Sequence, residues 1–414
     1  MSTASTHANA VGRWRPSRNV WAIAAVSFLT DASSEIIAPL LPLFLVGSLG
    51  ASVSMVGVIE GGAEAVASVL KLASGWWSDR VSRRKPLIVA GYALASLVRP
   101  FVAVAQSASQ VLAIRLVDRV GKGLRGAPRD ALLADSTPAA FRGRAFGMHR
   151  AADHAGAVVG PLIALLCLRG LGMPVRDVFW VAAIPGALAV LVAIVWIREA
   201  PRSAAPLAPI ETLAAPPLLT GHAAGIPVGA ALPQAFWRAL FPIVLFTLGN
   251  STDAFLLLRA SQLGVATAFI PLVWLVLHVV KSVSSTPAGA LSDRVGRRPL
   301  IVAGWMLYAA VYAGFAVATE PWHAWALFAV YGAVFGLTEG TEKALVADLV
   351  PAQRRGTAFG WYQGTVGVAA LPASIGFGMV WDHYGAPTAF GMGATIAVIA
   401  ALLMLLMARV PPTR

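Results

Sequence analysis

The chain has 414 residues, of which 57% are hydrophobic and only 12% are charged, and its mean hydropathy is +0.72. A soluble domain carries roughly 25% charged residues, so this composition excludes a soluble protein and indicates an integral membrane protein. The formal net charge of +13 lies in short turns between apolar segments, which is a topology signal and not a nucleic-acid surface. The single Cys167 excludes an intramolecular disulfide and a cysteine metal cluster.

Twelve apolar segments follow one another along the chain. They are long, at about 20 residues or more, and they lack the alternation of barrel strands, so we expect transmembrane helices. The segments cover residues 19–47, 54–78, 86–107, 109–134, 144–170, 177–198, 234–262, 264–291, 298–319, 322–348, 356–383 and 386–410. The predicted fold is an all-α membrane protein of about twelve helices in two pseudo-symmetric bundles of six.

The positions of Lys and Arg predict the orientation and the domains. Cations crowd alternate turns, and the positive-inside rule then places both termini in the cytoplasm. The predicted parts are a cytoplasmic N-terminal tail (1–18), a first bundle (19–198), a cytoplasmic linker (199–233), a second bundle (234–410) and a cytoplasmic C-terminus (411–414). The polar, basic start of the chain reads as a tail and not as a signal peptide. In a Gram-negative bacterium the compartment would be the inner membrane.

The two bundles are related by duplication. The hairpin GWWSDRVSRRK at 75–85 returns as GALSDRVGRR at 289–298, and each copy is followed by Pro and the identical stretch LIVAG. Residues 123–147 also align without a gap to residues 336–360. Such repeats, related by an axis along the membrane normal, are one of the transporter architectures.

With these motifs the whole chain resembles the major facilitator superfamily. The first hairpin is similar to the signature between the family's second and third helices, although Ser82 replaces its usual glycine. In the family, the aspartate of this hairpin helps to latch the cytoplasmic side. The resemblance therefore implies a gating role for the residues of both copies: Gly75, Asp79, Arg80, Gly289, Asp293 and Arg294.

Two further motifs resemble the proton-coupled exporter and drug–proton antiporter branch of the superfamily. In the fifth segment, the antiporter-like packing residues are Gly147, Gly156, Gly160 and Pro161. Ala164 and Leu165 stand where the family pattern ends in a glycine pair. In the fourth segment, Arg119 and the nearby Lys122-Gly123 resemble the family's helix-four motif, in which the arginine is implicated in proton coupling.

Charged side chains within the apolar segments are costly and commonly face a partner or a polar pathway. Asp31 and Glu35 are four residues apart, as are Glu60 and Glu64, so each pair shares one helix face. Two adjacent carboxylates favour protonation of one of them. The candidate proton or substrate residues are Asp31, Glu35, Glu60, Glu64, Lys71, Arg115, Asp118, Arg119, Arg129, Asp130, Asp253, Lys281, Glu339 and Glu342.

A structural alternative is that these acids and bases are ion pairs that hold helices together. The relay interpretation is stronger for the central acids of the first two segments. Lys281 could neutralise an anionic substrate or pair with Asp253. The pair Arg129-Asp130 aligns with Glu342-Lys343, a reversal of sign that suggests contacts across the halves.

The leading function is a secondary active transporter that works by alternating access, with proton-coupled efflux of a small organic compound. The alternatives are an importer or exporter of a charged metabolite, metal ion or metal chelate, and a receptor or sensor that keeps the fold without transport. The sequence has no phosphate-binding loop, nucleophile elbow or helical metal pair. We therefore expect no enzymatic activity, cofactor, bound metal or nucleic-acid partner. The expected partners are the lipid bilayer, protons and a small-molecule substrate, and the expected state is a monomer.

Overall fold

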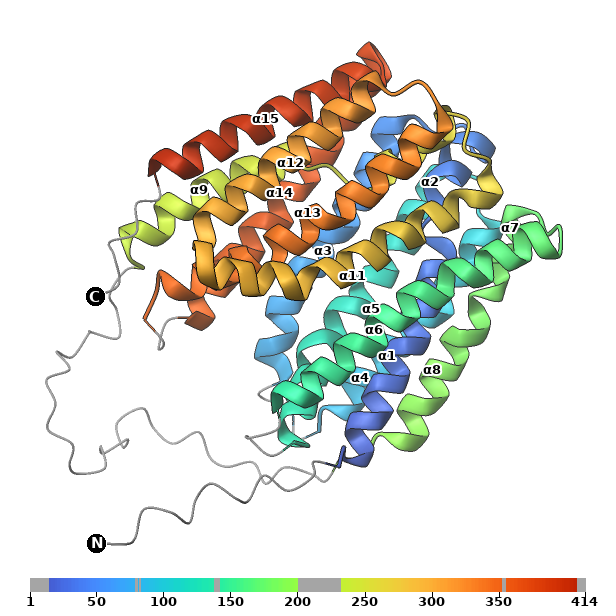
Figure 1. Ribbon diagram of the computed structural model, residues 1–414. Coiled ribbons are helices and arrows are strands. Elements are labelled where there is room, and N and C mark those ends of the chain that lie inside the picture. The colour runs from blue at the N-terminus through green and yellow to red at the C-terminus, as the bar shows by residue number, and fades with distance from the viewer. Residues whose placement is uncertain are drawn as a thin grey trace, which may run out of the picture.

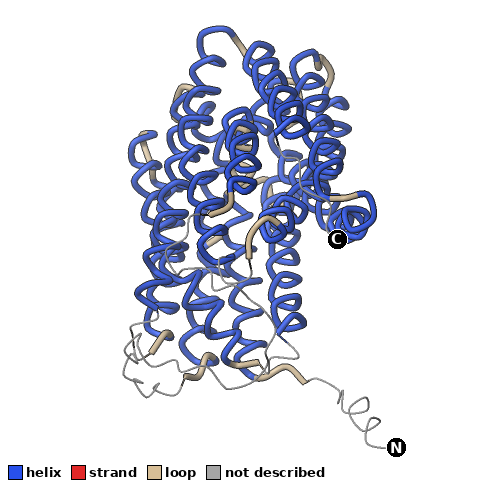
Figure 2. The backbone as a smooth tube through the Cα atoms, turned by 90° about the vertical axis from the view of Figure 1, so that its left-hand side faces the viewer, coloured by secondary structure: helices blue, strands red, loops and turns tan. Residues whose placement is uncertain are grey.

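The structure is a computed structural model, and it describes residues 15–78, 81, 83–137, 142–199, 232–351 and 355–407. Helices account for nearly all of these residues, and no strand occurs among them. Figure 2 shows the long helices lying side by side with short connections at their ends. The expectation of an all-α protein is confirmed.

The N-terminal half, residues 15–199, crosses the molecule six times. In chain order its elements are α1 (Arg18–Ile37), α2 (Leu41–Leu43) and η1 (Phe44–Ser48); α3 (Val53–Ser78); α4 (Lys85–Val98) and η2 (Arg99–Val104); α5 (Ala108–Asp135); α6 (Arg142–Leu165) and η4 (Leu166–Gly170); and α7 (Val175–Val181) and α8 (Ala183–Trp196). The helix bounds differ from the predicted segments by only a few residues.

The C-terminal half, residues 232–407, repeats this arrangement. Its elements are α9 (Gln234–Gly249) and α10 (Ala254–Gln262); η5 (Thr267–Phe269) and α11 (Ile270–Val295); α12 (Arg297–Val317); α13 (Pro321–Asp348); α14 (Arg355–Tyr384); and α15 (Ala386–Met407). Ten of the twelve crossings in the described chain are long and apolar enough to span a membrane. The remaining two are α5 and α13, which carry many of the candidate site residues.

The first crossing of each half is broken, and the two breaks occupy equivalent positions. The helix is interrupted at residues 38–40 in the N-terminal half and at 250–253 in the C-terminal half. An offset of 213 residues, which relates the two copies of LIVAG, maps 38–40 onto 251–253. The duplication therefore includes an irregular feature within two segments that were predicted as continuous helices.

The two halves meet along a few helices. In Figure 1 the blue-to-green N-terminal half and the yellow-to-red C-terminal half lie on opposite sides, with α3 and α11 near the middle. Contacts between the halves are made mainly by α3 with α14, α6 with α11 and α2 with α10. These pairs form the surface across which the halves must move if the protein alternates between two states.

The two ends of the molecule differ in whether the two halves pack together into one hydrophobic cluster. We call the end where α1 and α4 begin the basic end, and the end where α3 begins and α14 finishes the opposite end. One buried cluster joins residues from both halves, among them Phe44 and Phe255, which lie towards the opposite end. A second cluster, which includes Ile23, Ile88 and Ala193, belongs to the N-terminal half alone and lies towards the basic end. The halves thus share a hydrophobic core towards the opposite end.

Small residues allow α3 and α14 to approach closely. A Cβ atom added to Gly57 would overlap the backbone carbonyl of Ser374, and one added to Gly378 would overlap the backbone of Ser54. Close approach through small residues is a common way to pack transmembrane helices, since lipid provides no hydrophobic drive for their association. The contact between the halves therefore depends on backbone proximity.

The predicted packing glycines of the fifth crossing fall in α6, and two of them, Gly156 and Gly160, press on α1. Gly156 faces the backbone of Phe28, and Gly160 faces the backbone of Ala32 and the Cβ atom of Glu35. Pro161 lies inside the same helix, as does Gly147. This close contact positions the face of α1 that carries Asp31 and Glu35.

Candidate substrate and proton site

The predicted gating hairpins are only partly described. Asp79 and Arg80 lie outside the described residues, and so does the side chain of Asp293. Gly75 falls in α3, Gly289 falls in α11, and Arg294 is exposed in the last turn of α11. The gating role of all six residues stays a prediction.

Beside these hairpins the structure reveals a pair of equivalent salt bridges. Nη1 of Arg84 lies 2.7 Å from Oδ2 of Asp135, and Nε of Arg297 lies 3.2 Å from Oδ2 of Asp348. Both members of the second pair are 213 residues beyond those of the first. The sequence repeat already related the two aspartates, because ALLAD ends at Asp135 and ALVAD ends at Asp348. Each bridge fastens the start of one helix to the end of the next crossing.

Four charged side chains of the N-terminal half, of which Arg99, Arg115 and Asp118 are buried and Glu60 is half-buried, form one chain of contacts. Arg99 binds Oδ1 of Asp118 through Nε and Nη2, at 3.2 and 2.8 Å, and donates a further bond to Ser33 at 2.9 Å. Nη2 of Arg115 contacts both carboxylate oxygens of Glu60 at 2.8 and 2.6 Å. Nη1 of Arg115 also lies 3.9 Å from Asp118. These contacts favour the structural interpretation for Glu60, Arg115 and Asp118.

Three other acids of these helices form no described salt bridge. Within the described part of the chain, the carboxylates of Asp31, Glu35 and Glu64 have no salt-bridge partner within 4 Å. Lys122 of α5 interacts electrostatically with Asp31 and Glu64, and its own side chain is exposed. Nε of Arg119 is buried without a hydrogen-bond partner. Unpaired acids and cations therefore share the middle of the N-terminal half.

One of these acids makes contact with the other half. Nε1 of Trp274, in α11, donates to Oε2 of Glu35 at 2.7 Å. Trp274 also packs edge-on against His278, with ring centroids 4.9 Å apart. Sequence periodicity could not identify this contact, because it does not show which group a ring nitrogen binds. A neutral indole N–H can satisfy either a carboxylate or a protonated carboxyl group, so this bond suits a group that changes its charge.

The remaining candidates of the N-terminal half lie nearer the basic end. Arg129 bonds to its neighbour Asp130 at 2.9 Å, and this pair is partly open to solvent. Lys71 is half-buried, and no salt-bridge partner is described for it in this part of the chain. His149, in α6, pairs with Ser27 at 2.8 Å and lies 3.6 Å from Asp153. These contacts hold α1 to α6.

Two acids of the C-terminal half, Asp253 and Glu342, have neutral side chains as hydrogen-bond donors. Tyr331 donates to Asp253 at 2.8 Å. Glu342 is buried and accepts one bond from Trp305 and one from Tyr362, each at 3.0 Å. None of these aromatic partners was identified from the sequence, since they come from α12, α13 and α14.

Two expectations about the C-terminal cations are corrected. Lys281 pairs with Glu339 at 3.1 Å and not with Asp253, because α11 lies against α13. Lys343 binds the other oxygen of the same carboxylate, also at 3.1 Å. The sign-reversed pairs do not meet across the halves, because each forms its described contacts within its own half. No group of acids, histidines and cysteine able to hold a metal ion occurs among the described residues.

The fold and the charged centre define a multi-pass membrane transporter built from two six-helix halves. The sequence profile of the Major Facilitator Superfamily matches residues 23–280 and 254–414. An uncharacterized MFS-type transporter of Methanocaldococcus jannaschii is 32% identical over 94% of both chains. An uncharacterized protein of Mycobacterium tuberculosis is 30% identical over 95% of this chain and 93% of its own. The chain belongs to the Major Facilitator Superfamily and is a secondary transporter.

Other similarities are shorter or concern the fold alone. The multidrug resistance protein MdtH of Cronobacter sakazakii is 38% identical, but over only 27% of this chain and 28% of its own. The nucleoside transporter NupG has a TM-score of 0.73 at 15% identity over 95% and 100% of the two chains. A D-xylose–proton symporter has a TM-score of 0.74 at 17% identity over 95% and 98%. These structures share the fold and differ in what they carry.

Proposed function

We propose that this transporter exports a small organic compound in exchange for protons, without changing the compound chemically. The proposal is supported by the hydrogen bond between Glu35 and Trp274, which links an otherwise unpaired carboxyl group to the opposite half. Two of the antiporter-like glycines of α6, Gly156 and Gly160, press on α1 beside this same residue. The partial similarity to a multidrug resistance protein points to the same branch.

In this proposal the groups of the site have separate roles. Glu35 exchanges the proton, and Asp31 and Glu64 surround the substrate together with Lys122. Glu60 and Asp118 are held by Arg115 and Arg99, so we give them a structural role and move the coupling role to Glu35. Asp253 and Glu342 are secondary proton candidates, because uncharged donors satisfy them in either charge state.

Alternating access requires one end to open while the other closes. The shared apolar cluster and the contacts of Asp382 with the start of α3 support a state that is closed at the opposite end. We assign the basic end to the cytoplasm, and with it both termini and the linker at 199–233, because cations gather there. A monomer in the cytoplasmic membrane of a bacterium fits this assignment.

A second candidate is transport of an organic anion. Its support is the exposed ammonium group of Lys122, beside an Arg119 whose buried Nε has no partner. Two cations without salt bridges in the membrane interior would attract a carboxylate or phosphate group. The acids nearby would then carry the coupling protons alone.

The test uses proteoliposomes that contain the purified protein and a pH-sensitive dye. A pH gradient is imposed, and organic cations, neutral drugs and organic anions are added in turn. A compound that dissipates the gradient only when the protein is present supports proton exchange and identifies the substrate class. The Glu35→Gln variant should then bind the compound without moving protons. Proton movement that is unchanged in this variant would contradict the role of Glu35.

A further inference from the structure

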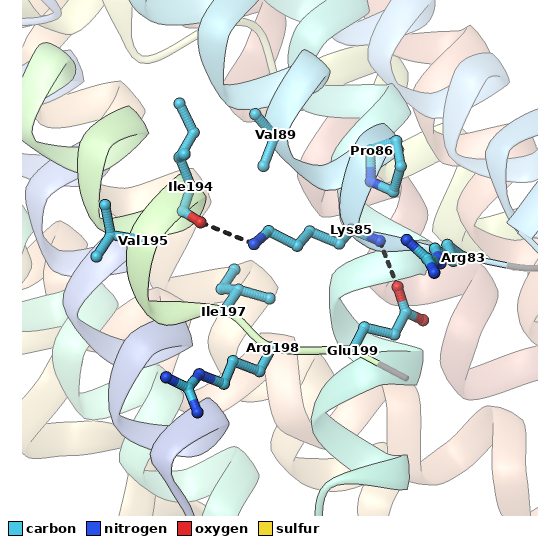
Figure 3. A pocket seen from close by; sticks show the side chains of 9 residues that line it. All are labelled: Arg83, Lys85, Pro86, Val89, Ile194, Val195, Ile197, Arg198 and Glu199. Atoms are coloured by element: carbon cyan, nitrogen blue, oxygen red, sulfur yellow. Dashed lines mark hydrogen bonds between the residues drawn. The ribbon is translucent and has the colours of Figure 1, made fainter. Parts of the chain in front are cut away.

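A surface pocket of about 700 Å³ opens at the basic end, between the start of α4 and the end of α8. Figure 3 shows the side chains that line it. Its apolar wall is made by Pro86, Val89, Ile194, Val195 and Ile197, and its polar residues are Arg83, Lys85, Arg198 and Glu199. The pocket is remote from the transport site and has no part in the function proposed above.

The framework of this pocket is fixed by hydrogen bonds. Lys85 donates its ammonium group to the carbonyl of Ile194 and its backbone N–H to Glu199, each at 2.7 Å (Figure 3). Arg18 donates to the carbonyls of Val195 and Trp196, each at 3.1 Å. These cations satisfy the last carbonyl groups of α8, which have no partners within the helix. The backbone around the pocket is thus held in place without a ligand.

Two guanidinium groups remain available. Arg83 and Arg198 are both exposed, and among the described residues neither side chain has a hydrogen-bond or salt-bridge partner. The one carboxylate among the described lining residues, on Glu199, already accepts a backbone N–H. In the described part of the lining, three cations therefore face one acid, and an anion would be attracted to the pocket mouth.

The apolar wall decides what kind of anion fits. Ile194 and Val195 are about half exposed, at 50% and 53%, and they lie in the last turn of a membrane-spanning helix. A soluble anion gains nothing from such a surface, whereas the acyl chains of a lipid cover it. The position at the end of a crossing is also the depth of a phospholipid headgroup.

We propose that this pocket is a binding site for an anionic phospholipid of the leaflet at the basic end. The phosphate group lies between Arg83 and Arg198, the headgroup occupies the pocket, and the acyl chains run along Val89 and Ile194. Because α4 and α8 both belong to the N-terminal half, the lipid would stay with that half as the two halves move.

The test is native mass spectrometry of the purified full-length protein in detergent, titrated with phosphatidylglycerol and, separately, with phosphatidylcholine. Wild-type protein should retain phosphatidylglycerol preferentially. The double variant Arg83→Gln/Arg198→Gln should bind it about thirtyfold more weakly, since each basic side chain near an anionic headgroup contributes roughly fivefold. A matched control is Arg238→Gln/Arg294→Gln, which removes two exposed arginines of the C-terminal half. Equal loss in both double variants would overturn the proposal, and so would no loss in the first.

A second arm distinguishes a lipid from a soluble phosphate compound. Ile194→Ser should weaken phosphatidylglycerol binding without affecting the binding of glycerol 3-phosphate, since only the lipid contacts the apolar wall. If glycerol 3-phosphate binds as tightly as the lipid, or if Ile194→Ser changes nothing, the site accepts a soluble phosphate and the lipid assignment is wrong.

Discussion

The indole of Trp274 donates to the carboxyl group of Glu35 over 2.7 Å, and this bond joins α11 of one half to α1 of the other. The halves are also joined by hydrogen bonds at the opposite end, where Asp382 meets the start of α3. The contact at Glu35 differs because it involves a carboxyl group beside the unpaired acids and cations. A change in the charge of Glu35 therefore alters a contact between the two halves directly.

Glu35→Gln should strongly reduce proton-driven transport while substrate exchange across the membrane continues. A glutamine keeps an acceptor for Trp274 but cannot carry a proton, so flux driven by the pH gradient should fall about tenfold or more, as expected for a coupling free energy of roughly 1–3 kcal/mol. The measurement compares gradient-driven uptake with exchange in the same proteoliposomes. Trp274→Phe is the control, because it removes the hydrogen bond and keeps the proton carrier. Loss of exchange and coupling together in Glu35→Gln would point to a structural role.

Glu60→Gln should destabilise the protein more than the double change Glu60→Gln/Arg115→Gln. The single variant leaves the guanidinium of Arg115 buried without its main counter-charge, a loss of about 3 kcal/mol. The double variant removes both charges. Thermal unfolding in detergent, followed by tryptophan fluorescence, ranks the stability of the wild type, the single variant and the double variant. If the single variant is as stable as wild type, Glu60 is not a structural partner and its proton role must be considered again.

Asp382→Asn should favour opening of the opposite end. Oδ1 and Oδ2 of Asp382 accept the N–H groups of Val53 and Ser54, at 2.9 and 2.8 Å. A carboxylate at a helix N-terminus contributes up to about 1 kcal/mol, so the open population should rise roughly fivefold. The measurement is the maleimide labelling rate of a cysteine placed at Leu40, with Cys167 replaced by alanine.

The control for this experiment is Glu320→Gln. Glu320 caps α13 within its own half, and its loss should leave labelling unchanged. Equal rates in the Asp382→Asn variant and in the unmodified background would mean that this contact does not hold the end closed.

Gly57→Ala should impair the protein where Gly62→Ala does not. A methyl group on Gly57 would overlap the carbonyl of Ser374, and separating α3 from α14 costs roughly 1–3 kcal/mol. At Gly62 the nearest atom to the added methyl group is the Cδ2 of Leu116, at 3.9 Å. Thermal unfolding and transport rate should both fall for the first variant alone. If the two variants behave alike, α3 and α14 can separate at Gly57 without a loss of stability.

Much of the architecture follows from sequence. The predicted segments begin and end within a few residues of the helices, because about 20 apolar residues are needed to cross a bilayer and charged turns cannot lie within it. The repeat of LIVAG and of the ALLAD-type segments predicted two equivalent halves. The breaks at 38–40 and 250–253 were not predicted, although Pro39 lies in the first and the polar run Asn250-Ser251-Thr252-Asp253 forms the second.

The sequence identified the charged residues of the candidate site, but it did not identify which of them contact each other. The sequence placed Glu35 and Glu60 in the same class, because both are acids that share a helix face with a second acid. Packing separates them: α5 brings Arg115 to Glu60, and α11 brings Trp274 to Glu35. The same applies to Lys281, whose partner Glu339 lies on a helix that sequence spacing could not relate to it.

The sequence alone determined that this protein is a duplicated, twelve-crossing membrane protein, and which charges lie within its apolar segments. Hydropathy and repeats carry that information locally, residue by residue. Only the tertiary structure decided which of these charges neutralise each other and which stay unpaired at the centre. The physical reason is that an ion pair depends on the distance between atoms of different helices, and helix rotation and packing set that distance.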